Sequence, residues 1–469
     1  MKNLNRALAL LVIALGLPIA AAEKNAVTPK RPNVVVIMVD DLGSGDVSCL
    51  FRNVVKTPNI DRLAKTGVKF TSGYVTAPLC APSRAGLFSG VYQQRYGFID
   101  NSGGIPSNTK LFPGALRDAG YHTGLIGKWH SKGPMPFERG CFDETLCSPT
   151  SVPFIDYHHP KLARNGTLEM SDEYSTDLFA REAEEFIERN KDKPFSLTVT
   201  FNAPHILKVV SPAFTFIKPY EEALAAGTVF KVPFVPMSRP GEAEKYADQF
   251  PGDPLRADVV ATIVALDQAV GRILDKLKQV GVDQDTIVFF TGDNGGHPEN
   301  RSENTPLRDY KWTLYEGGIR VPFFAVYPAV FPAGLEFKHP VSTLDIFPTL
   351  AALTGAKTPA DLDGINLTPY LTGEMDHPPH DELYFGIKSW GNIYQGAMRQ
   401  GDWKLVLTDG ANQQLYNLSN DVGEKNNLAS VETERVTELT KKWKAWQTRI
   451  PPPPGKVKAK RRAKIKAPE

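Results

Sequence analysis

Cysteine and long hydrophobic runs are scarce in this chain, and each scarcity excludes a class of protein. The 469 residues include 4 cysteines, which is too few for a small fold held together by disulfide bonds. Beyond residue 22, no stretch stays apolar for the ~20 residues that a membrane-spanning helix needs, so we expect no stable membrane insertion. Hydrophobic residues make up 42% of the chain and charged residues 23%, a composition typical of globular proteins.

A strong excess of one charge is absent from most of the chain, although the formal net charge is +2. Seven bases and one acid lie in residues 451–469, and two bases and no acid lie in residues 1–22. Residues 23–450 therefore carry 45 bases against 51 acids, a balance of −6, and nothing in them indicates a nucleic-acid partner. The Pro/Lys-rich tail at 451–469 is expected to be disordered, either solvated or docked on an anionic polymer.

The first 22 residues have the organisation of a secretory signal peptide. Lys2 and Arg6 precede an apolar stretch at 7–22, which ends in three alanines. A transmembrane anchor is the alternative, but the stretch is shorter than a bilayer requires and contains Pro18. We therefore expect a signal peptide at 1–22 and an exported protein, either periplasmic or secreted.

Continuous apolar, β-branched runs alternate with amphipathic segments through most of the chain. Asn33–Val39 and 286–290 are such runs, and further strands are expected at 196–201 and 322–326. Strands that are buried on both faces of a parallel sheet have this pattern. Residues 256–280 have apolar side chains at helical spacing. Strands that alternate with helices predict an α/β sheet covered on both faces.

The sequence changes in character after residue 366, where Pro/Gly-rich loops separate short strands. This change predicts a main domain at 23–366 and a smaller α+β subdomain at 367–450. Its strands are expected at 383–387, 403–407 and 414–417, and its final helix at 431–448.

Acidic and amide side chains follow the ends of two predicted strands. Asp40 and Asp41 come directly after the first strand, and Asp293 and Asn294 follow the strand at 286–290. Ligands of open α/β sheets bind outside the carboxyl ends of the strands, so we expect these side chains to converge. Calcium prefers such oxygen ligands, whereas zinc would need histidine or cysteine beside them. Either pair alone is equally consistent with a turn before glycine.

A short motif surrounds Cys80, which is followed by Ala81, Pro82, Ser83 and Arg84. Taken alone, it is consistent with a buried thiol before the start of a helix. The pattern Cys-x-Pro-Ser-Arg nevertheless resembles the signature of the formylglycine-dependent (type I) sulfatases of the alkaline-phosphatase-like superfamily. In that family the cysteine is oxidised before folding to an aldehyde, formylglycine.

The resemblance extends over nearly all of the chain after residue 22. Its other motifs are the strand and paired aspartates at 33–41, a helix at 58–64, a second signature at 120–130 with Lys128 and His130, Ala-Pro-His at 203–205, Asp-Asn-Gly at 293–295, the segment 306–322 with Lys311, and later landmarks at 342–350 (with Asp345) and 415–418. Three departures fall where the family's substrate pocket would lie, namely Leu207, Asp309-Tyr310 and Ser131-Lys132.

The resemblance implies an alkaline-phosphatase-like sandwich, in which helices flank a large, mostly parallel central sheet and a small C-terminal α+β subdomain follows. It makes 23–366 the catalytic domain, and it implies a formylglycine-generating enzyme as a partner during maturation. The implied catalytic residues are Cys80, Arg84, Lys128, His130, His205 and Lys311, and the implied ligands of one calcium ion are Asp40, Asp41, position 80, Asp293 and Asn294.

The chemistry of sulfate esters explains why these residue types are needed. The oxygens of a sulfate monoester repel nucleophiles, so calcium and the cations Arg84, Lys128 and Lys311 must gather positive charge around it. One hydroxyl of the hydrated aldehyde attacks sulfur, and the other then loses its proton so that sulfate is expelled. The resemblance gives His130 the role of that base and places His205, with Lys311, at the leaving group. His158, His159 and His297 fit no motif and are interpreted as loop residues.

Several alternatives remain open from the sequence. Sulfated carbohydrate is the expected substrate, and aromatic residues in the loop 206–250 either stack against a sugar or pack within the protein. The alternatives to a sulfatase are a phosphonate or phosphodiester hydrolase of the same superfamily and a glycan-binding homologue without turnover. Cys141 and Cys147 are consistent either with a disulfide or with two reduced, buried thiols.

Overall fold

The computed structural model describes residues 31–52, 54–151, 155–206, 236–388, 394–408 and 412–450. The signal peptide expected at 1–22, Leu207, most of the aromatic loop and the tail at 451–469 lie outside the described residues.

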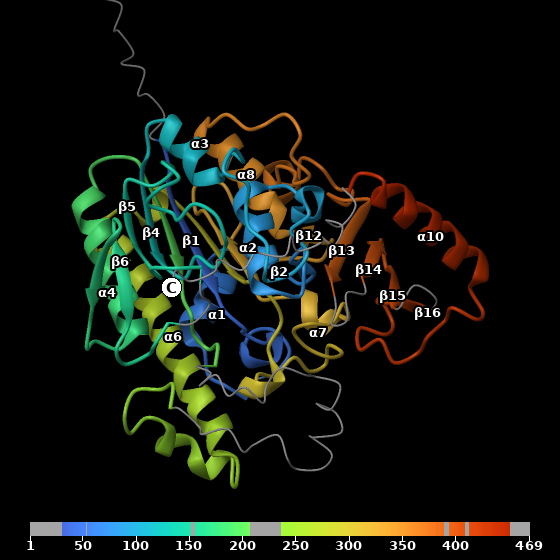
Figure 1. Ribbon diagram of the computed structural model, residues 1–469, viewed down its shortest axis with the longest axis horizontal. Coiled ribbons are helices and arrows are strands. Elements are labelled where there is room, and N and C mark those ends of the chain that lie inside the picture. Colours follow the sequence, from blue (N-terminus) through green and yellow to red (C-terminus); the bar gives the residue numbers. More distant parts are fainter. Residues whose placement is uncertain are drawn as a thin grey trace, which may run out of the picture. The chain divides into compact units, whose positions relative to one another are not determined.

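A large sheet runs through the larger part of the described chain (Figure 1). It has ten strands in the order β11-β2-β10-β9-β1-β8-β4-β5-β6-β7. The five consecutive strands from β9 to β5 are mutually parallel, while β10 and β6 pair with them in the antiparallel direction. In the order given, the strands are Leu335–Phe337, Val68–Phe70, Phe323–Val326, Thr286–Gly292, Asn33–Val39, Phe195–Thr200, His122–Gly127, Glu144–Cys147, Lys161–Arg164 and Thr167–Met170. The predicted large, mostly parallel sheet is confirmed.

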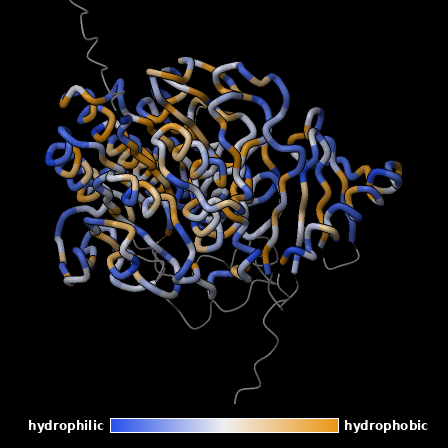
Figure 2. The backbone as a smooth tube through the Cα atoms, turned by 90° about the horizontal axis from the view of Figure 1, so that it is seen from above, coloured by the Kyte–Doolittle hydropathy of each residue, from blue (hydrophilic) through white to orange (hydrophobic). Residues whose placement is uncertain are grey.

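Helices cover both faces of this sheet, and the central strand β1 accordingly has apolar side chains on both faces. In β1, Val35 and Ile37 pack into one cluster with α1, α4 and α6, whereas Val34 and Val36 pack into another with α2, α3 and α8. Each such fully buried side chain stabilises the fold by about 2 kcal/mol. Figure 2 shows hydrophobic stretches through the interior of this region and mainly hydrophilic stretches at its periphery. The helices are Pro58–Thr66 (α1), Cys80–Ser89 (α2), Phe112–Asp118 (α3), Ser175–Asn190 (α4), Pro254–Gln279 (α6) and Ile346–Thr354 (α8).

A separate four-stranded antiparallel sheet, here called the C-terminal sheet, follows the large one. Helix α10 (Thr433–Gln447) packs on it through Leu439 and Trp443. Its strands are Glu382–Lys388 (β13), Tyr394–Gln400 (β14), Trp403–Thr408 (β15) and Asn412–Asn417 (β16). Short elements outside both sheets include β3 (Gly73–Tyr74), which pairs with β12 (Val341–Ser342), and the one-turn helices α7 (Glu316–Ile319) and α9 (Thr368–Leu371).

Some sequence expectations need adjustment. The strand at 286–290 continues to Gly292, and β14 was not expected because its polar residues hide the alternation of a half-buried strand. Helix α6 begins two residues earlier than expected, since Asp253 accepts a hydrogen bond from the Arg256 N–H at its start. Cys141 and Cys147 are both free and buried. Within the described ranges, no helix has the length and hydropathy to cross a bilayer.

Candidate active site

Three strand ends meet at the carboxyl edge of the large sheet. Strands β1 and β9 are parallel neighbours, so Asp40, which follows β1, and Asp293, which follows β9, are adjacent. The backbone N–H of Asp41 donates to Asp293 Oδ1 at 3.3 Å, across 252 residues of sequence. The N–H of Asp40 donates at 3.2 Å to the carbonyl of Ala203, beyond the end of β8. The topology of the sheet therefore gathers acidic groups from distant parts of the chain.

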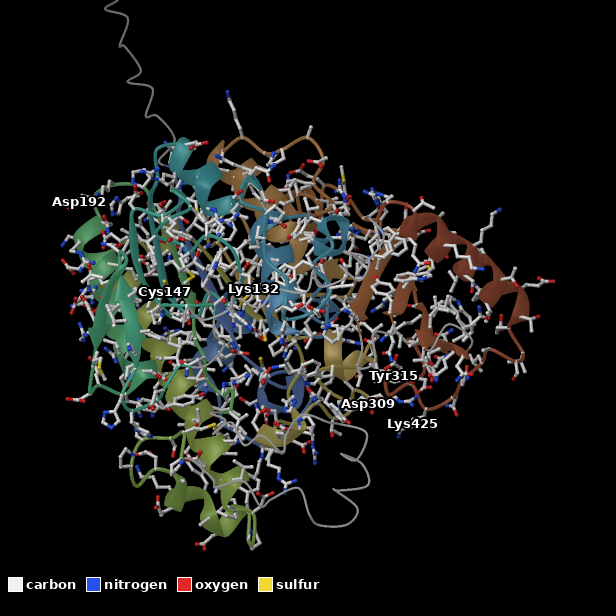
Figure 3. All side chains as sticks on the ribbon, viewed as in Figure 1. Lys132, Cys147, Asp192, Asp309, Tyr315 and Lys425 are labelled. Carbon is white, nitrogen blue, oxygen red and sulfur yellow. The ribbon has the colours of Figure 1, made fainter. Side chains whose placement is uncertain are left out.

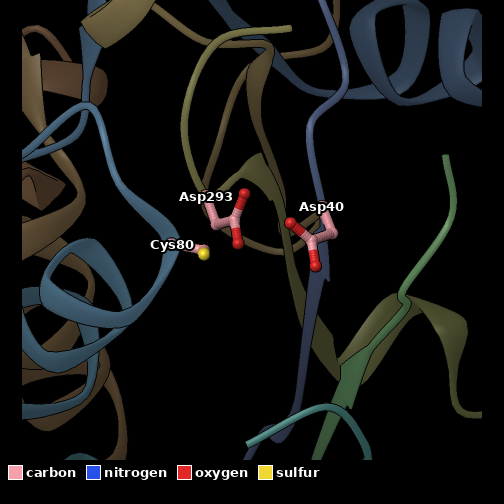
Figure 4. A group of neighbouring side chains, drawn as sticks. All are labelled: Asp40, Cys80 and Asp293. Carbon is pink, nitrogen blue, oxygen red and sulfur yellow. The ribbon is translucent and has the colours of Figure 1, made fainter. Parts of the chain in front are cut away.

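Cys80 reaches this edge from the first turn of α2. The preceding residue, Leu79, has an extended backbone, and the helix begins at Cys80 itself. The Cys80 Sγ and one carboxylate oxygen each of Asp40 and Asp293 all lie within 4.8 Å of one another. Figure 4 shows these three side chains converging from α2 and from the ends of β1 and β9. Burial raises the pKa of the Cys80 thiol, so the unmodified side chain is neutral.

Arg84 lies four residues after Cys80 and therefore on the same side of α2. Its Nε donates to Asp293 Oδ2 at 2.9 Å, its Nη2 lies 2.8 Å from the same oxygen, and its Nη1 donates to the carbonyl of Lys128 at 2.9 Å. Burial alone would lower the pKa of Arg84, but the charges of Asp293 and Asp40 outweigh it and raise the pKa. The guanidinium is a fixed positive charge that ties the Cys80 helix to the end of β9.

Strand β4 ends in a tight turn that presents Lys128 and His130. Gly127 has a φ of +107°, and a Cβ at this position would lie 2.1 Å from the carbonyl oxygen of Thr200, so the turn requires glycine. Lys128 Nζ forms a fully buried ion pair with Asp40. Burial, together with the positive charge of Lys128, lowers the pKa of His130 well below its usual range. The imidazole of His130 is therefore neutral near pH 7.

Asp41 is contacted by residues from three other segments. Its Oδ1 accepts hydrogen bonds from Lys311 Nζ and from Asn294 Nδ2, both at 2.7 Å. Its Oδ2 lies 3.6 Å from Nε2 of His205. The other ring nitrogen, Nδ1, donates to the carbonyl of Ile206 at 2.8 Å, and burial lowers the pKa of His205 well below its usual range. Near pH 7 the His205 ring is therefore neutral, and its Nε2 faces the acidic group.

Unpaired oxygens inside the site show whether a cation fits it. Asp40 Oδ1 and Asn294 Oδ1 are buried and accept no hydrogen bond from the described residues. Burial and the charge of Asp40 raise the pKa of Asp293 to about 7, which reflects a crowding of negative charge that a divalent cation relieves. Carboxylate and amide oxygens are the ligands that calcium prefers. The donor set at the ends of β1 and β9 therefore fits a calcium ion.

The structure brings together all the site residues that the sequence suggested. The three histidines interpreted as loop residues make other contacts: His158 with the carbonyl of Pro236, His159 with Asp172, and His297 with the N–H of Glu299. Of the three departures from the family pattern, Ser131 is buried and its Oγ accepts from the N–H of Ile105 at 3.0 Å. Lys132 and Asp309 are exposed.

Asn101 contacts Cys80 but was missed from the sequence. Its Oδ1 accepts from the N–H of Ala81 at 3.3 Å and lies 3.9 Å from Cys80 Sγ, which donates to it. It therefore caps the first turn of α2 from a different segment of the chain. A polar, Gly-rich loop at 100–104 was the only signal in the sequence, and such loops are common on protein surfaces.

Comparison with known proteins finds matches over most of the chain. The family model described as sulfatase matches residues 32–356, and the model for the C-terminal part of N-sulphoglucosamine sulphohydrolase matches residues 308–449. The mouse (Mus musculus) N-acetylgalactosamine-6-sulfatase is 31% identical over 414 residues, which are 79% of this chain and 71% of that protein. The rat (Rattus norvegicus) steryl-sulfatase is 28% identical and covers 75% of this chain and 72% of its own.

Solved structures show the same fold. The crystal structure of Ps i-CgsB is 29% identical, with a TM-score of 0.79, and the match covers 91% of this chain and 94% of that one. The same protein has also been solved in complex with k-i-k-neocarrahexaose. The likeness thus spans both the large sheet and the C-terminal sheet.

Proposed function

The chain belongs to the sulfatase family and is a sulfuric ester hydrolase, and from this premise we propose that it is an exported, calcium-dependent enzyme that removes sulfate from carbohydrates. The observation that carries the proposal is the buried convergence of Cys80, Asp40 and Asp293 at one edge of the sheet. Arg84 connects the nucleophile's helix to this acidic group.

The acidic edge would hold the cation. Asp40, Asp41, Asp293 and Asn294, with the side chain at position 80, would be its ligands, and the two unpaired oxygens of Asp40 and Asn294 support that assignment. When bound, calcium supplies positive charge that stabilises the charge of a sulfate group. Arg84, Lys128 and Lys311 add three buried cations around the same space.

Position 80 would carry the nucleophile. When Cys80 is oxidised to formylglycine, the hydrated aldehyde supplies two hydroxyls on one carbon, one to attack sulfur and one whose deprotonation expels the sulfate. Because Cys80 is only 1% exposed in the folded chain, a maturing enzyme would have to act before folding is complete. Asn101 contacts the first turn of α2, and Arg84 follows Cys80 by one turn on the same helix, so both would orient the side chain at position 80.

The two histidines would transfer protons beside the acidic group. His130 lies beside Lys128 and is neutral, as a base must be to accept a proton near pH 7. His205 and Lys311 both contact Asp41 and would serve the departing oxygen of the substrate. Without the buried positive charges of Arg84, Lys128 and Lys311, the negative charge that develops on the sulfate group and the departing oxygen would be uncompensated.

Sulfated saccharides are the substrates that the comparisons support best. Relatives include an N-acetylgalactosamine-6-sulfatase, and the protein solved with k-i-k-neocarrahexaose is 28% identical to this chain. Steryl and aryl sulfates are the second candidate, because steryl-sulfatase is a comparable relative. The complete set of catalytic residues argues against a homologue that binds glycans without turnover.

A substrate panel tests the reaction and the substrate class together. Protein co-produced with a formylglycine-generating enzyme should release inorganic sulfate from sulfated saccharides and, more slowly, from small aryl sulfates. Protein produced without that enzyme is the control and should be nearly inactive. Turnover of a phosphonate monoester, with every sulfate ester left intact, would replace this proposal with a phosphonate hydrolase.

Export has its own test. We expect the protein that accumulates in the periplasm or medium of a bacterial host to lack residues 1–22, as measured by the mass of the intact chain. Retention of the full chain in the cytoplasm of such a host would contradict it.

A further inference from the structure

The segment 308–320, which carries Lys311, is held at its first end by the C-terminal part of the chain. The Arg308 guanidinium donates through Nη1 to the hydroxyl of Tyr416 at 2.9 Å and to the carbonyl of Glu424 at 2.8 Å. It also lies over the ring of Tyr315, 3.9 Å from the ring centroid. Figure 3 labels Asp309 and Tyr315 on this segment and Lys425 on the C-terminal side of the contact.

The other end of the segment is held by a buried cluster of three charges. Glu316, the first residue of α7, accepts from Lys404 Nζ at 2.9 Å through Oε1, and its backbone N–H donates to Glu424 Oε2 at 2.6 Å. Lys404 also lies 2.9 Å from Glu424 Oε1. All three side chains are 0% exposed. Lys404 comes from β15 and Glu424 from the loop after β16, so both partners belong to the C-terminal part.

Backbone hydrogen bonds join the two ends to each other and join the second end to the acidic edge of the large sheet. The N–H of Gly317 donates to the carbonyl of Arg308 at 2.7 Å, which closes the segment into a loop. The N–H of Gly295, next to Asn294, donates to the carbonyl of Gly318 at 3.0 Å. A Cβ on Gly295 would lie 1.7 Å from the carbonyl oxygen of Gly317. A displacement of α7 would therefore shift the backbone at Gly295, directly beside the proposed calcium ligands Asp293 and Asn294.

Stability alone is a weak reason for such a cluster. Buried ion pairs lose much of their attraction to desolvation, and apolar side chains of similar volume often replace them without loss of stability. A cluster of this kind favours one arrangement of the segments that it joins, because Lys404 is compensated where Glu316 and Glu424 both meet it. Here the segments joined are the C-terminal sheet and the loop of Lys311.

We propose that Lys404 and Glu424 are positioning residues for the sulfatase reaction, which hold the loop 308–320 so that Lys311 meets Asp41 and the substrate. The inference rests on the proposed role of Lys311 in catalysis. Lys311 itself is fixed by its N–H, which donates to the carbonyl of Gly296 at 3.1 Å, and by Nζ on Asp41. Without the side chains of Lys404 and Glu424, the second end of the loop would lose its charged partners in the C-terminal sheet and the loop that follows it.

Two variants are needed because they leave different charges behind. Lys404→Met leaves Glu424 beside Glu316, although Glu316 keeps Tyr74 and Arg320 as partners. Glu424→Gln preserves shape and keeps the Lys404–Glu316 pair, and it is the milder change because burial and Glu316 raise the pKa of Glu424 to about 7. If Lys404→Met fails to fold, Glu424→Gln carries the test.

Leu405→Ala is the matched control. Leu405 neighbours Lys404 in β15, is fully buried, and packs toward α10 instead of toward α7. It should weaken the C-terminal sheet without releasing the loop of Lys311.

The first measurement is amide hydrogen exchange of the chain with unmodified Cys80. Both test variants should raise exchange in 308–320 at least tenfold, whereas Leu405→Ala should raise it mainly in β14–β16. Unchanged exchange in 308–320, or the same increase in Leu405→Ala, overturns the proposal. This result does not depend on whether the chain is an active sulfatase.

The second measurement is sulfate release by the matured enzyme, compared at equal fractions of folded protein. We expect kcat/KM to fall at least tenfold in both test variants and less than threefold in Leu405→Ala. Faster exchange in 308–320 with unchanged kcat/KM would overturn the catalytic part of the inference, because the loop would then be released without consequence for the reaction.

Discussion

Arg84 and Asp293 form a buried ion pair that joins the Cys80 helix to the acidic edge. Two nitrogens of the arginine, Nε and Nη2, lie 2.9 Å and 2.8 Å from the same carboxylate oxygen, Oδ2. The third nitrogen, Nη1, reaches the carbonyl of Lys128. One planar side chain therefore fixes three segments that approach the site from different directions.

Arg84→Lys should consequently cost most of the activity, although it keeps the charge. Lysine places a single ammonium where the guanidinium binds two groups at fixed angles. We expect kcat/KM for sulfate release to fall by roughly 10²–10³, the usual effect of losing one preorganised polar contact in an active site. Arg95→Lys is the control, since Arg95 pairs with Asp361 and Asp363. Equal activity of the two variants would contradict a role for this geometry.

Calcium should stabilise the folded chain before any modification of Cys80. Ligand at about 100 times its dissociation constant adds about 2.7 kcal/mol to the free energy of unfolding, which is measurable as a rise in melting temperature. The rise in melting temperature should disappear in Asp40→Asn, which removes the negative charge of a carboxylate whose Oδ1 accepts no hydrogen bond from the described residues. It should persist in Asp275→Asn, since that carboxylate pairs with Arg62 at the surface. Stoichiometric zinc in the isolated protein, with no response to calcium after chelation, would rule out this site.

The parts of this fold that sequence predicts well are those that a single physical demand dictates. After Asn33, strand β1 is apolar at every position because helices cover both of its faces, so this strand is recognisable from the sequence. Asp40 and Asp293 follow such strands, and parallel pairing obliges them to meet. The resemblance to a family supplied the remaining residues of the site.

Other features depend on contacts between distant segments and leave no local pattern. Lys404 lies within a short apolar strand and looks like an exposed position, yet it is fully buried against Glu316 and Glu424. Asn101 belongs to a loop of ordinary composition, and its importance is evident only from its contact with Cys80 in the fold. Strand β14 contains the buried Arg399, whose partner Tyr74 lies 325 residues away.

Stability should depend on pH through His380 and Asp345. His380 Nε2 lies 2.8 Å and 2.9 Å from the two carboxylate oxygens of Asp345. Burial lowers the pKa of His380, but the attraction of Asp345 outweighs it and the net pKa is raised above 6.5. Because the folded state holds this proton more tightly than the unfolded state, the pair stabilises the fold fully below about pH 6.5. That contribution is lost as the pH rises through the raised pKa.

His380→Gln should therefore lower the free energy of unfolding by about 1–3 kcal/mol at pH 5.5 and by less at pH 8.5. Urea denaturation at the two pH values measures the difference. His377→Gln alters an exposed histidine near the same loop and serves as the control. A loss in His380→Gln that is the same at both pH values would show that the contact does not titrate as stated.

Cys80→Ser tests why the nucleophile should be an aldehyde hydrate. Serine at position 80 would stand at the same place in the first turn of α2, within reach of Asp40 and Asp293. Its single hydroxyl is able to attack sulfur once, with Arg84, Lys128 and the cation to offset the charge. It has no second hydroxyl on the same carbon, so the sulfate cannot be expelled by collapse to a carbonyl. We expect negligible steady turnover and a stable sulfate ester on the introduced serine, visible by mass spectrometry of the peptide that contains position 80.

Cys80→Ala separates this outcome from simple inactivation. Alanine offers no hydroxyl, so it should be equally inactive but acquire no sulfate on that peptide. Both variants should be made in a host that lacks an enzyme able to oxidise serine, because oxidation would restore the aldehyde. Since hydrolysis of the trapped ester requires water to attack a crowded, anionic sulfur, the adduct should outlast removal of the substrate. Sustained multiple turnover by Cys80→Ser, with serine verified at the position, would show that the second hydroxyl is unnecessary and that the proposed route is wrong.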